Sequence, residues 1–134
     1  MATLVSEIME QDIISVNIVD SLKTVANVFE NIKIRHLPVM SGDTLFGMVS
    51  KSDVSRMKQF CQVLDSGDKA LYEELERVSI KAIMKSPITI DKSKTIKEAT
   101  EILVKNHFHA IPVTDNGKMV GIVTSTDLLN YYTK

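Results

Sequence analysis

The feature that most constrains this chain is a motif that occurs twice at one fixed spacing. Residues 47–53 (Gly-Met-Val-Ser-Lys-Ser-Asp) and 121–127 (Gly-Ile-Val-Thr-Ser-Thr-Asp) share a glycine, two apolar residues, a hydroxyl residue and an aspartate. Segments 37–39 and 111–113 before them match as well, each with a central proline, and prolines and aspartates alike are 74 residues apart. Repeats of this length are structural units, so the chain consists of two copies of one unit.

The length and composition are those of one globular domain. A chain of 134 residues can bury a sizeable core, and 44% hydrophobic and 25% charged residues are ordinary for a folded protein. A net charge of −1 without a run of Lys or Arg argues against a nucleic-acid partner. We expect no membrane span and no signal peptide, because no apolar stretch is long enough and residues 1–7 lack a basic start. The single cysteine, Cys61, favours a cytoplasmic location.

Each copy predicts an α/β unit of the order strand–helix–strand–strand–helix. β-Branched runs predict the first strand, and apolar residues at helical spacing behind Ser21 and Thr95 predict the first helix. Turns rich in Gly, Asp and Asn at 41–43 and 115–117 predict hairpins. The predicted elements are strands at 13–16, 36–40 and 45–49 with helices at 22–32 and 51–64, then strands at 88–90, 110–113 and 119–123 with helices at 96–108 and 125–132.

The repeat also predicts the domain organisation. The first repeat spans 4–57, a helical connector spans 58–78, and the second repeat spans 79–133, all within one domain. Short lead-ins at 4–9 and 79–84 resemble one another. In the connector, one helical face collects four apolar or aromatic residues, Leu71, Tyr72, Leu75 and Val78.

Two such units in register, each with an apolar-Pro-Val strand and the motif Gly-apolar-Val-[Ser/Thr]-x-x-Asp, resemble the CBS domain pair, named after cystathionine β-synthase. The resemblance covers nearly the whole chain except the connector. It implies tandem repeats with pseudo-two-fold symmetry that commonly form homodimers. It further implies adenosine-type ligands in clefts between the repeats, and a regulatory sensor rather than an enzyme.

The motif residues have a structural reading and a ligand-binding reading. A hydroxyl residue three positions before an acid at a helix start is typical of a capping box. The same helix start suits a phosphate, and a carboxylate can accept both hydroxyls of a ribose. The resemblance implies ribose binding by the aspartates and phosphate contacts from the hydroxyl residues, namely Asp53 with Ser50 and Ser52, and Asp127 with Thr124 and Thr126.

The resemblance also implies that each cleft uses both repeats. The Asp127 cleft would add Val25, Ile34, Arg35 and His36, and the Asp53 cleft would add Lys94, Ala99, Phe108, His109 and Ala110. Core packing is the alternative for the apolar members, and we prefer it for Val25 and Ala99. Because Lys94 stands where the first repeat carries Asp20, the Asp53 cleft is expected to bind nucleotides more tightly and to prefer more phosphates.

Other chemistry is not indicated. His107 and His109 lack a third ligand at metal spacing, and their counterparts Lys33 and Arg35 suit an anion instead. No nucleophile–base arrangement and no phosphate-binding glycine loop is present. A small hydrolase is therefore the least favoured class.

The sequence predicts a regulatory, energy-sensing module that binds AMP, ADP or ATP and signals occupancy to an unidentified partner protein. S-adenosyl compounds, cyclic dinucleotides and NAD are further ligand options, and no cofactor, metal, nucleic-acid or membrane partner is expected. The alternative is a ligand-free protein–protein interaction or dimerisation module. We expect a homodimer through the apolar residues of the last helices, Val54, Met57, Phe60, Val63, Leu64, Leu128, Leu129 and Tyr131.

Overall fold

The computed structural model describes residues 2–64, 73 and 76–133, and for residues 60–64 it describes the backbone alone. The chain forms two compact units. The β1–β3 unit contains Ser15–Gly42 and Phe46–Ser86, and the β4–β6 unit contains the chain up to Ile14, Asp43–Leu45 and the part from Pro87 onward. Of the predicted connector face, Leu71, Tyr72 and Leu75 lie outside the described residues.

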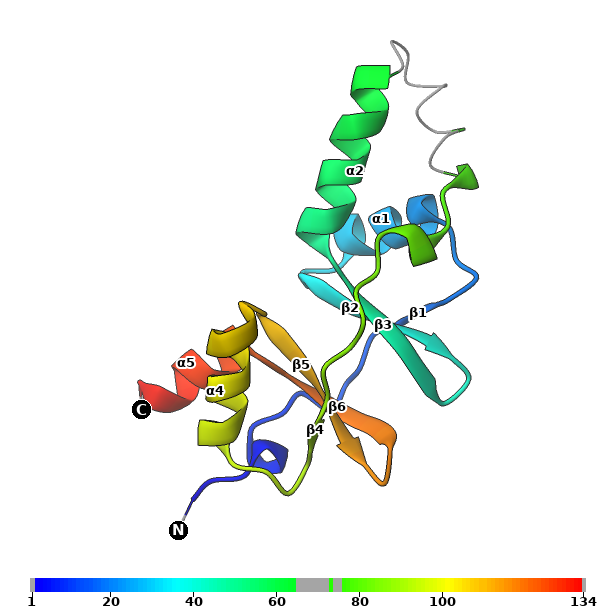
Figure 1. Cartoon of the computed structure of the whole chain (residues 1–134). Coiled ribbons are helices and arrows are strands. Elements are labelled where there is room, and N and C mark those ends of the chain that lie inside the picture. Colours follow the sequence, from blue (N-terminus) through cyan, green and yellow to red (C-terminus); the bar gives the residue numbers. More distant parts are fainter. Residues whose placement is uncertain (1, 65–72, 74–75, 134) are drawn as a thin grey trace. The chain divides into compact units, whose positions relative to one another are not determined.

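The first sheet consists of β1 (Val16–Asn17), β2 (His36–Ser41) and β3 (Thr44–Ser50) in the order β1-β2-β3. β1 runs parallel to β2, with Val16 opposite Val39. Helices α1 (Leu22–Asn31) and α2 (Lys51–Leu64) belong to the same unit, and Figure 1 shows them beside this sheet. The predicted order of elements is therefore confirmed for the first repeat.

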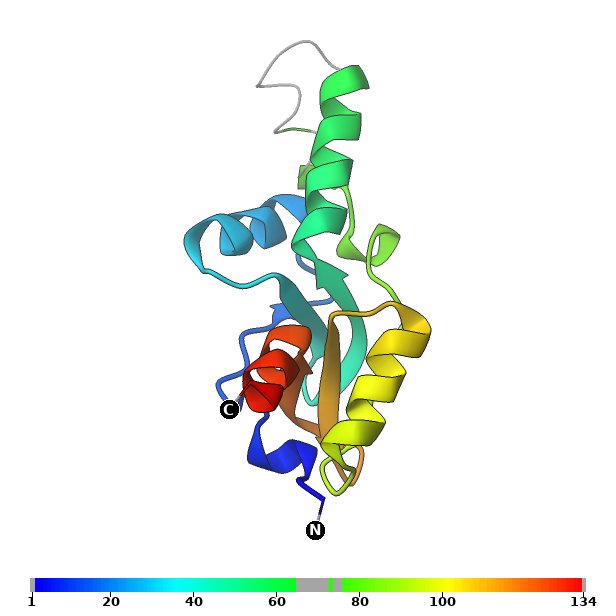
Figure 2. The same cartoon turned by 90° about the vertical axis from the view of Figure 1, so that its left-hand side faces the viewer.

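The second sheet repeats this plan with β4 (Ile90–Asp91), β5 (Ala110–Asp115) and β6 (Lys118–Thr124) in the order β4-β5-β6. β4 is parallel to β5, and β5 is antiparallel to β6. Figure 2 shows α4 (Ile96–Asn106) and α5 (Ser125–Tyr132) beside these strands. Asn116 and Gly117 both have positive φ, which suits the hairpin turn predicted at 115–117.

Several predicted boundaries are wrong, among them the end of the helix predicted at 96–108, because α4 ends at Asn106 and His107 has a left-handed backbone. The first strand of each repeat begins later than the β-branched runs indicate, because only Val16–Asn17 and Ile90–Asp91 pair with the neighbouring strand. Ile14 lies before β1 and is 39% exposed. Ile32 follows α1 with an extended backbone and is not part of the helix.

Each unit has its own hydrophobic core. In the β1–β3 unit, α1 contributes Leu22, Val25 and Phe29 to a cluster with β2 and β3. In the β4–β6 unit, Ile96, Ala99 and Leu103 of α4 take the corresponding places against β5 and β6. Burial of an aliphatic or aromatic side chain contributes about 1.5–3 kcal/mol, so these helix faces hold each sheet to its helices.

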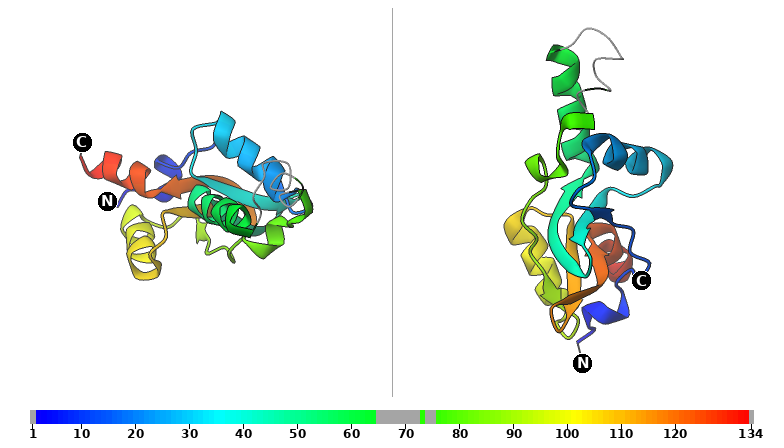
Figure 3. Two further views of the ribbon diagram at one scale, coloured as in Figure 1. Left: turned by 90° about the horizontal axis from the view of Figure 1, so that it is seen from above. Right: turned by 90° about the vertical axis from the view of Figure 1, so that its right-hand side faces the viewer.

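The lead-ins are exchanged between the repeats. The segment around the 3-10 turn η1 (Val5–Glu7) binds the second repeat, with Val5 N donating to Lys94 O (2.9 Å) and Glu10 N to Ile122 O (2.8 Å). The segment around η2 (Ile80–Ala82) binds the first repeat, with Lys85 N donating to Met48 O (2.8 Å). Both segments can be followed in Figure 3. Each compact unit therefore combines the body of one repeat with the lead-in of the other.

The motif glycines make this exchange possible. A Cβ on Gly47 would lie 2.9 Å from the Lys85 carbonyl oxygen, and a Cβ on Gly121 would lie 2.5 Å from Met9 Sδ. Glycine in a strand is expected where another backbone approaches closely, and here the approaching backbone is a lead-in segment.

Candidate functional site

The two motifs occupy the same position in their units, at the junction of the last strand and the last helix. Thr124 is the N-cap of α5: its hydroxyl accepts from Asp127 N (3.2 Å), and Thr124 N donates to Asp127 Oδ2 (2.9 Å). At the start of α2, Ser50 Oγ accepts from Asp53 N (3.0 Å), and Ser50 N lies 3.4 Å from Asp53 Oδ2. The capping-box reading of both motifs is therefore confirmed, which does not prevent a ligand from also using them.

Among the described residues, Asp53 is the charged residue that is buried, with 8% of its surface exposed. Arg56 and Lys85 both reach its Oδ1, Arg56 as a hydrogen-bonded ion pair and Lys85 at 3.7 Å. Burial raises the pKa of Asp53, but the hydrogen bonds from Ser50 and Arg56 and the charge of Lys85 outweigh this and hold the pKa below its ordinary value. Asp53 is therefore ionised at neutral pH and carries two cations beside it.

Asp127 has a different environment. It is half-buried, and its Oδ2 accepts the hydrogen bond from Thr124 N. Within the described part of the chain it forms no ion pair. The two aspartates thus share one backbone setting but differ in the charges around them.

The residues before the middle strands lie next to the motif of their own repeat. Lys51 N donates to Arg35 O (2.8 Å), and Ser125 N donates to His109 O (2.9 Å). Ser52 and Thr126 are exposed in the first turns of α2 and α5. The structure therefore brings together, within each unit, the motif residues and the segment 34–36 or 108–110.

The apolar candidates are part of the cores. Val25 and Ala99 are fully buried, which confirms the packing role preferred for them. Ala110 is also buried, and Ile34 and Phe108 are partly buried against the cores of their own units. A direct ligand contact from any of these residues remains a prediction.

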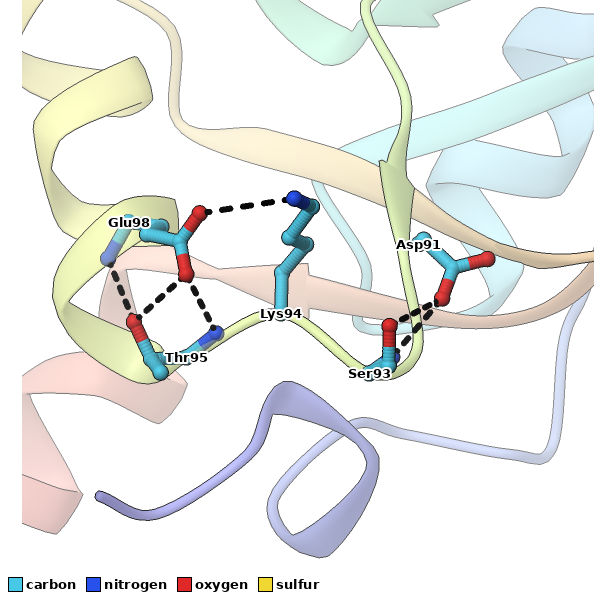
Figure 4. A network of polar contacts seen from close by, with 5 residues as sticks. All are labelled: Asp91, Ser93, Lys94, Thr95 and Glu98. Atoms are coloured by element: carbon cyan, nitrogen blue, oxygen red, sulfur yellow. Dashed lines mark hydrogen bonds and ion pairs between the residues drawn. The ribbon is translucent and has the colours of Figure 1, made fainter.

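Lys94 lies in a polar network at the start of α4 (Figure 4). Its Nζ is 3.9 Å from Glu98 Oε2, while Thr95 and Glu98 form a capping box. Hydrogen bonds from the Ser93 side chain and backbone lower the pKa of Asp91. In the first repeat, Asp20 instead accepts from Asn17 N (2.8 Å). The expected difference in nucleotide affinity between the two clefts stays a prediction.

Neither a metal site nor a membrane span emerges from the described residues. Among them, no three His, Cys, Asp or Glu side chains are grouped closely enough to hold a metal ion. Every described helix is too short or too polar to cross a bilayer.

A family model described as "CBS domain" matches residues 5–58 and 80–134. The chain belongs to the CBS domain family. Among curated proteins, one relative is the uncharacterised protein MJ1225 of Methanocaldococcus jannaschii, 28% identical over 131 residues that cover 96% of this chain and 47% of that protein. Its crystal structure superimposes with a TM-score of 0.80, covering 98% of this chain and 48% of that one. The chain spans about half or less of the length of the curated relatives it matches first.

Two solved CBS-pair proteins match over nearly their whole length. The CBS domain pair of protein MJ0100, in complex with 5′-methylthioadenosine and S-adenosyl-L-methionine, has a TM-score of 0.79 at 24% identity and covers 99% of this chain and 98% of that one. CBSX2, a protein of Arabidopsis thaliana, in complex with AMP has a TM-score of 0.79 at 22% identity and covers 98% and 96%. At these identities the similarity shows the fold, and the fold is that of a tandem CBS pair.

Arg56, Lys85 and Glu10 are not among the site residues that the sequence predicts. The signal was available for Arg56, because the spacing of 74 residues pairs it with Asn130 beside the second motif. No such signal exists for Lys85 and Glu10, because their contacts depend on the exchange of lead-ins, which a sequence repeat does not reveal.

Proposed function

We propose that this CBS pair is a regulatory module that binds an adenosine-type ligand, with AMP, ADP and ATP as the first candidates. The observation that carries the proposal is the presence of two hydroxyl-x-x-Asp motifs at equivalent strand–helix junctions. Solved CBS pairs of the same fold in complex with AMP, and with 5′-methylthioadenosine and S-adenosyl-L-methionine, support this ligand class.

The chemistry of each motif fits a nucleotide. The first backbone N–H groups of α2 and α5 carry the positive end of the helix dipole, which favours a phosphate. Ser52 and Thr126 are exposed there and can add hydroxyl donors. A carboxylate at the same junction can accept the two vicinal hydroxyls of a ribose.

Ligand binding regulates only if it changes the conformation of the module. A bound ligand can shift a conformational equilibrium only by the difference in its affinity for the two conformations. We infer that the module reports nucleotide levels to a partner protein and performs no catalysis itself. A cytoplasmic location stays a prediction from the single cysteine.

A homodimer also belongs to the proposal, but its expected surface is smaller than the sequence suggests. Val54 and Leu128 are buried in the cores of their own units, so the prediction that they form the dimer contact is wrong. Leu129 and Tyr132 of α5 and Val104 of α4 are exposed, and α4 and α5 pack against each other. The side chains of Phe60, Val63 and Leu64 lie outside the described part of the chain.

A ligand-free interaction module is the second candidate, and the capping boxes favour it. Ser50, Asp53, Thr124 and Asp127 already have partners within their own motifs. In that case the aspartates stabilise helix starts, and losing one cap interaction costs about 0.5–2 kcal/mol without any effect on a ligand.

A thermal-shift screen over adenosine, AMP, ADP, ATP and GMP separates the two candidates. A ligand at about 100 times its dissociation constant stabilises the folded state by about 2.7 kcal/mol. We expect adenine ligands, but not GMP, to raise the melting temperature of the parent protein. Asp53→Ala and Asp127→Ala should each remove part of the ligand-induced shift. Equal shifts in the parent and both variants would contradict the ribose role, and no shift with any adenine ligand would favour the interaction module.

A further inference from the structure

The residues beside the two motifs differ in charge at four corresponding positions. On the body of the repeat, Arg35, Lys51 and Arg56 of the first copy correspond, 74 residues later, to His109, Ser125 and Asn130. On the exchanged lead-ins, the correspondence comes from the backbone. Lys85 exchanges two hydrogen bonds with Met48 (2.9 and 2.8 Å), and Glu10 exchanges two with Ile122 (3.0 and 2.8 Å).

Lys85 and Glu10 therefore stand at equivalent places beside the two motif glycines. The first copy carries Arg or Lys at all four positions, whereas the second carries neither at any of them and has a carboxylate instead of Lys85. The two sites therefore share one backbone geometry but differ in the charge of the side chains beside it.

Around Asp53 the cations are placed to bind a further anion. Arg56 and Lys85 both approach the same carboxylate oxygen, yet 69% of the Arg56 side chain and 62% of the Lys85 side chain are exposed. A guanidinium has five N–H donors and an ammonium has three, so contact with one oxygen leaves donors directed to solvent. Two cations beside one carboxylate leave a net positive charge at the start of α2.

Around Asp127 the balance is the opposite. The carboxylate of Asp127 forms no ion pair within the described residues. Glu10, at the place of Lys85, adds a second negative charge, and its Oε1 accepts from Asp12 N (3.0 Å). An added phosphate would meet like charges here, whereas a ribose would meet a carboxylate that no cation neutralises.

We propose that the two motifs sort adenosine ligands by charge, an inference that rests on the proposed function. The Asp53 motif takes phosphorylated adenosine ligands, and Arg56 and Lys85 are its phosphate-binding side chains. The Asp127 motif takes adenosine derivatives whose 5′ substituent is uncharged or cationic. Charge-assisted contacts from Arg and Lys are the strong contacts to phosphate, so the presence of these two residues decides the class of ligand.

The competing reading is that Arg56 and Lys85 only neutralise the buried carboxylate of Asp53. Both readings predict a change in stability when the cations are removed. They differ in ligand selectivity, because a purely structural role would alter the binding of adenosine and of ATP alike.

Calorimetry of the full chain at low salt, with adenosine and ATP as probes, distinguishes these readings. The key variant is Arg56→Asn with Lys85→Glu, which gives the first motif the residues of the second. The reciprocal variant is Asn130→Arg with Glu10→Lys. Lys58→Gln is the matched control, since it removes a cation from the same helix that pairs with Glu30 (3.1 Å) and not with Asp53.

We expect the key variant to lose at least about tenfold in ATP affinity while its adenosine affinity changes less than about threefold, a difference that cannot come from folding alone. The reciprocal variant should gain ATP affinity at the second motif, which keeps the test valid if the key variant does not fold. ATP and adenosine affinities that change together, or not at all, in the folded variants would overturn the sorting of ligands by charge. A folded parent protein that binds neither probe would instead overturn the proposed function.

Discussion

Replacing Gly47 with alanine tests the exchange of lead-ins, because the new methyl group would meet the lead-in of the other repeat. Its Cβ would lie 2.9 Å from the Lys85 carbonyl oxygen and 2.9 Å from Met84 Sδ, whereas ordinary contacts begin at 3.4 Å. The Lys85 carbonyl would have to retreat by about 0.5 Å. That carbonyl accepts from Met48 N at 2.9 Å, and a movement of this size takes the hydrogen bond out of its usual range.

The expected cost follows from two opposing terms. Overpacking of this kind costs about 1–3 kcal/mol. Replacing glycine by alanine also restricts the unfolded chain, which stabilises the protein by about 0.4–1 kcal/mol. We therefore expect Gly47→Ala to lower the free energy of unfolding by about 1–2 kcal/mol.

Gly121→Ala is the matched control in the second repeat. There the nearest atoms belong to the Met9 side chain (Sδ at 2.5 Å and Cγ at 2.8 Å), and the nearest backbone atom, Glu10 O, is 3.1 Å away. A methionine side chain is flexible and can repack. Gly121→Ala should therefore lower the free energy of unfolding by less than about half as much as Gly47→Ala does.

Urea unfolding followed by circular dichroism measures both variants, and a change of midpoint at constant slope reports stability. A Gly47→Ala protein as stable as the parent would refute the packing of Ser79–Lys85 onto the first repeat. A larger loss in Gly121→Ala would refute the argument that the Met9 side chain can repack.

Three further predictions follow from charge and assembly. The pKa of Asp53 is lower in the folded protein than its ordinary value of 3.8. Ionised Asp53 therefore stabilises the fold fully above pH 3.8, and this stabilisation is lost as the pH falls through the lower folded pKa. Urea midpoints measured from neutral to acid pH should fall less steeply in Asp53→Asn than in the parent. Lys94→Asp should weaken ATP binding at low salt, and unchanged affinity in calorimetry would refute the charge ranking of the clefts. Light scattering at micromolar concentration should give about twice the 15.0 kDa of one chain, and a monomer mass would exclude the homodimer.

The sequence predicts local elements well where one repeat confirms the other. The helices at 51–64 and 125–132 and the turn at 115–117 coincide with α2, α5 and the β5–β6 turn. Capping residues such as Thr95 and Thr124 form the hydrogen bonds that their types indicate. These features depend on short-range contacts, which a sequence pattern records directly.

Features that depend on contacts between distant segments could not be predicted in this way. The β-branched run at 13–16 predicts a strand, but the strand begins only at Val16, where hydrogen bonding with β2 begins. The sequence pattern predicts Val54 and Leu128 to lie in a dimer contact, but both are buried in the cores of their own units. The repeat aligns each lead-in with the copy that follows it, while the fold attaches it to the other copy. The sequence pattern therefore does not predict that Lys85 lies beside Asp53.

Equilibrium binding of AMP tests directly whether this CBS pair binds an adenosine-type ligand. Isothermal titration of the purified, folded chain with AMP, with GMP as the control ligand, measures affinity and stoichiometry without any partner protein. We expect saturable binding of AMP, no comparable binding of GMP, and loss of AMP binding when Asp53→Ala and Asp127→Ala are combined. A folded protein that takes up no AMP, or a double variant that binds AMP as the parent does, would contradict it.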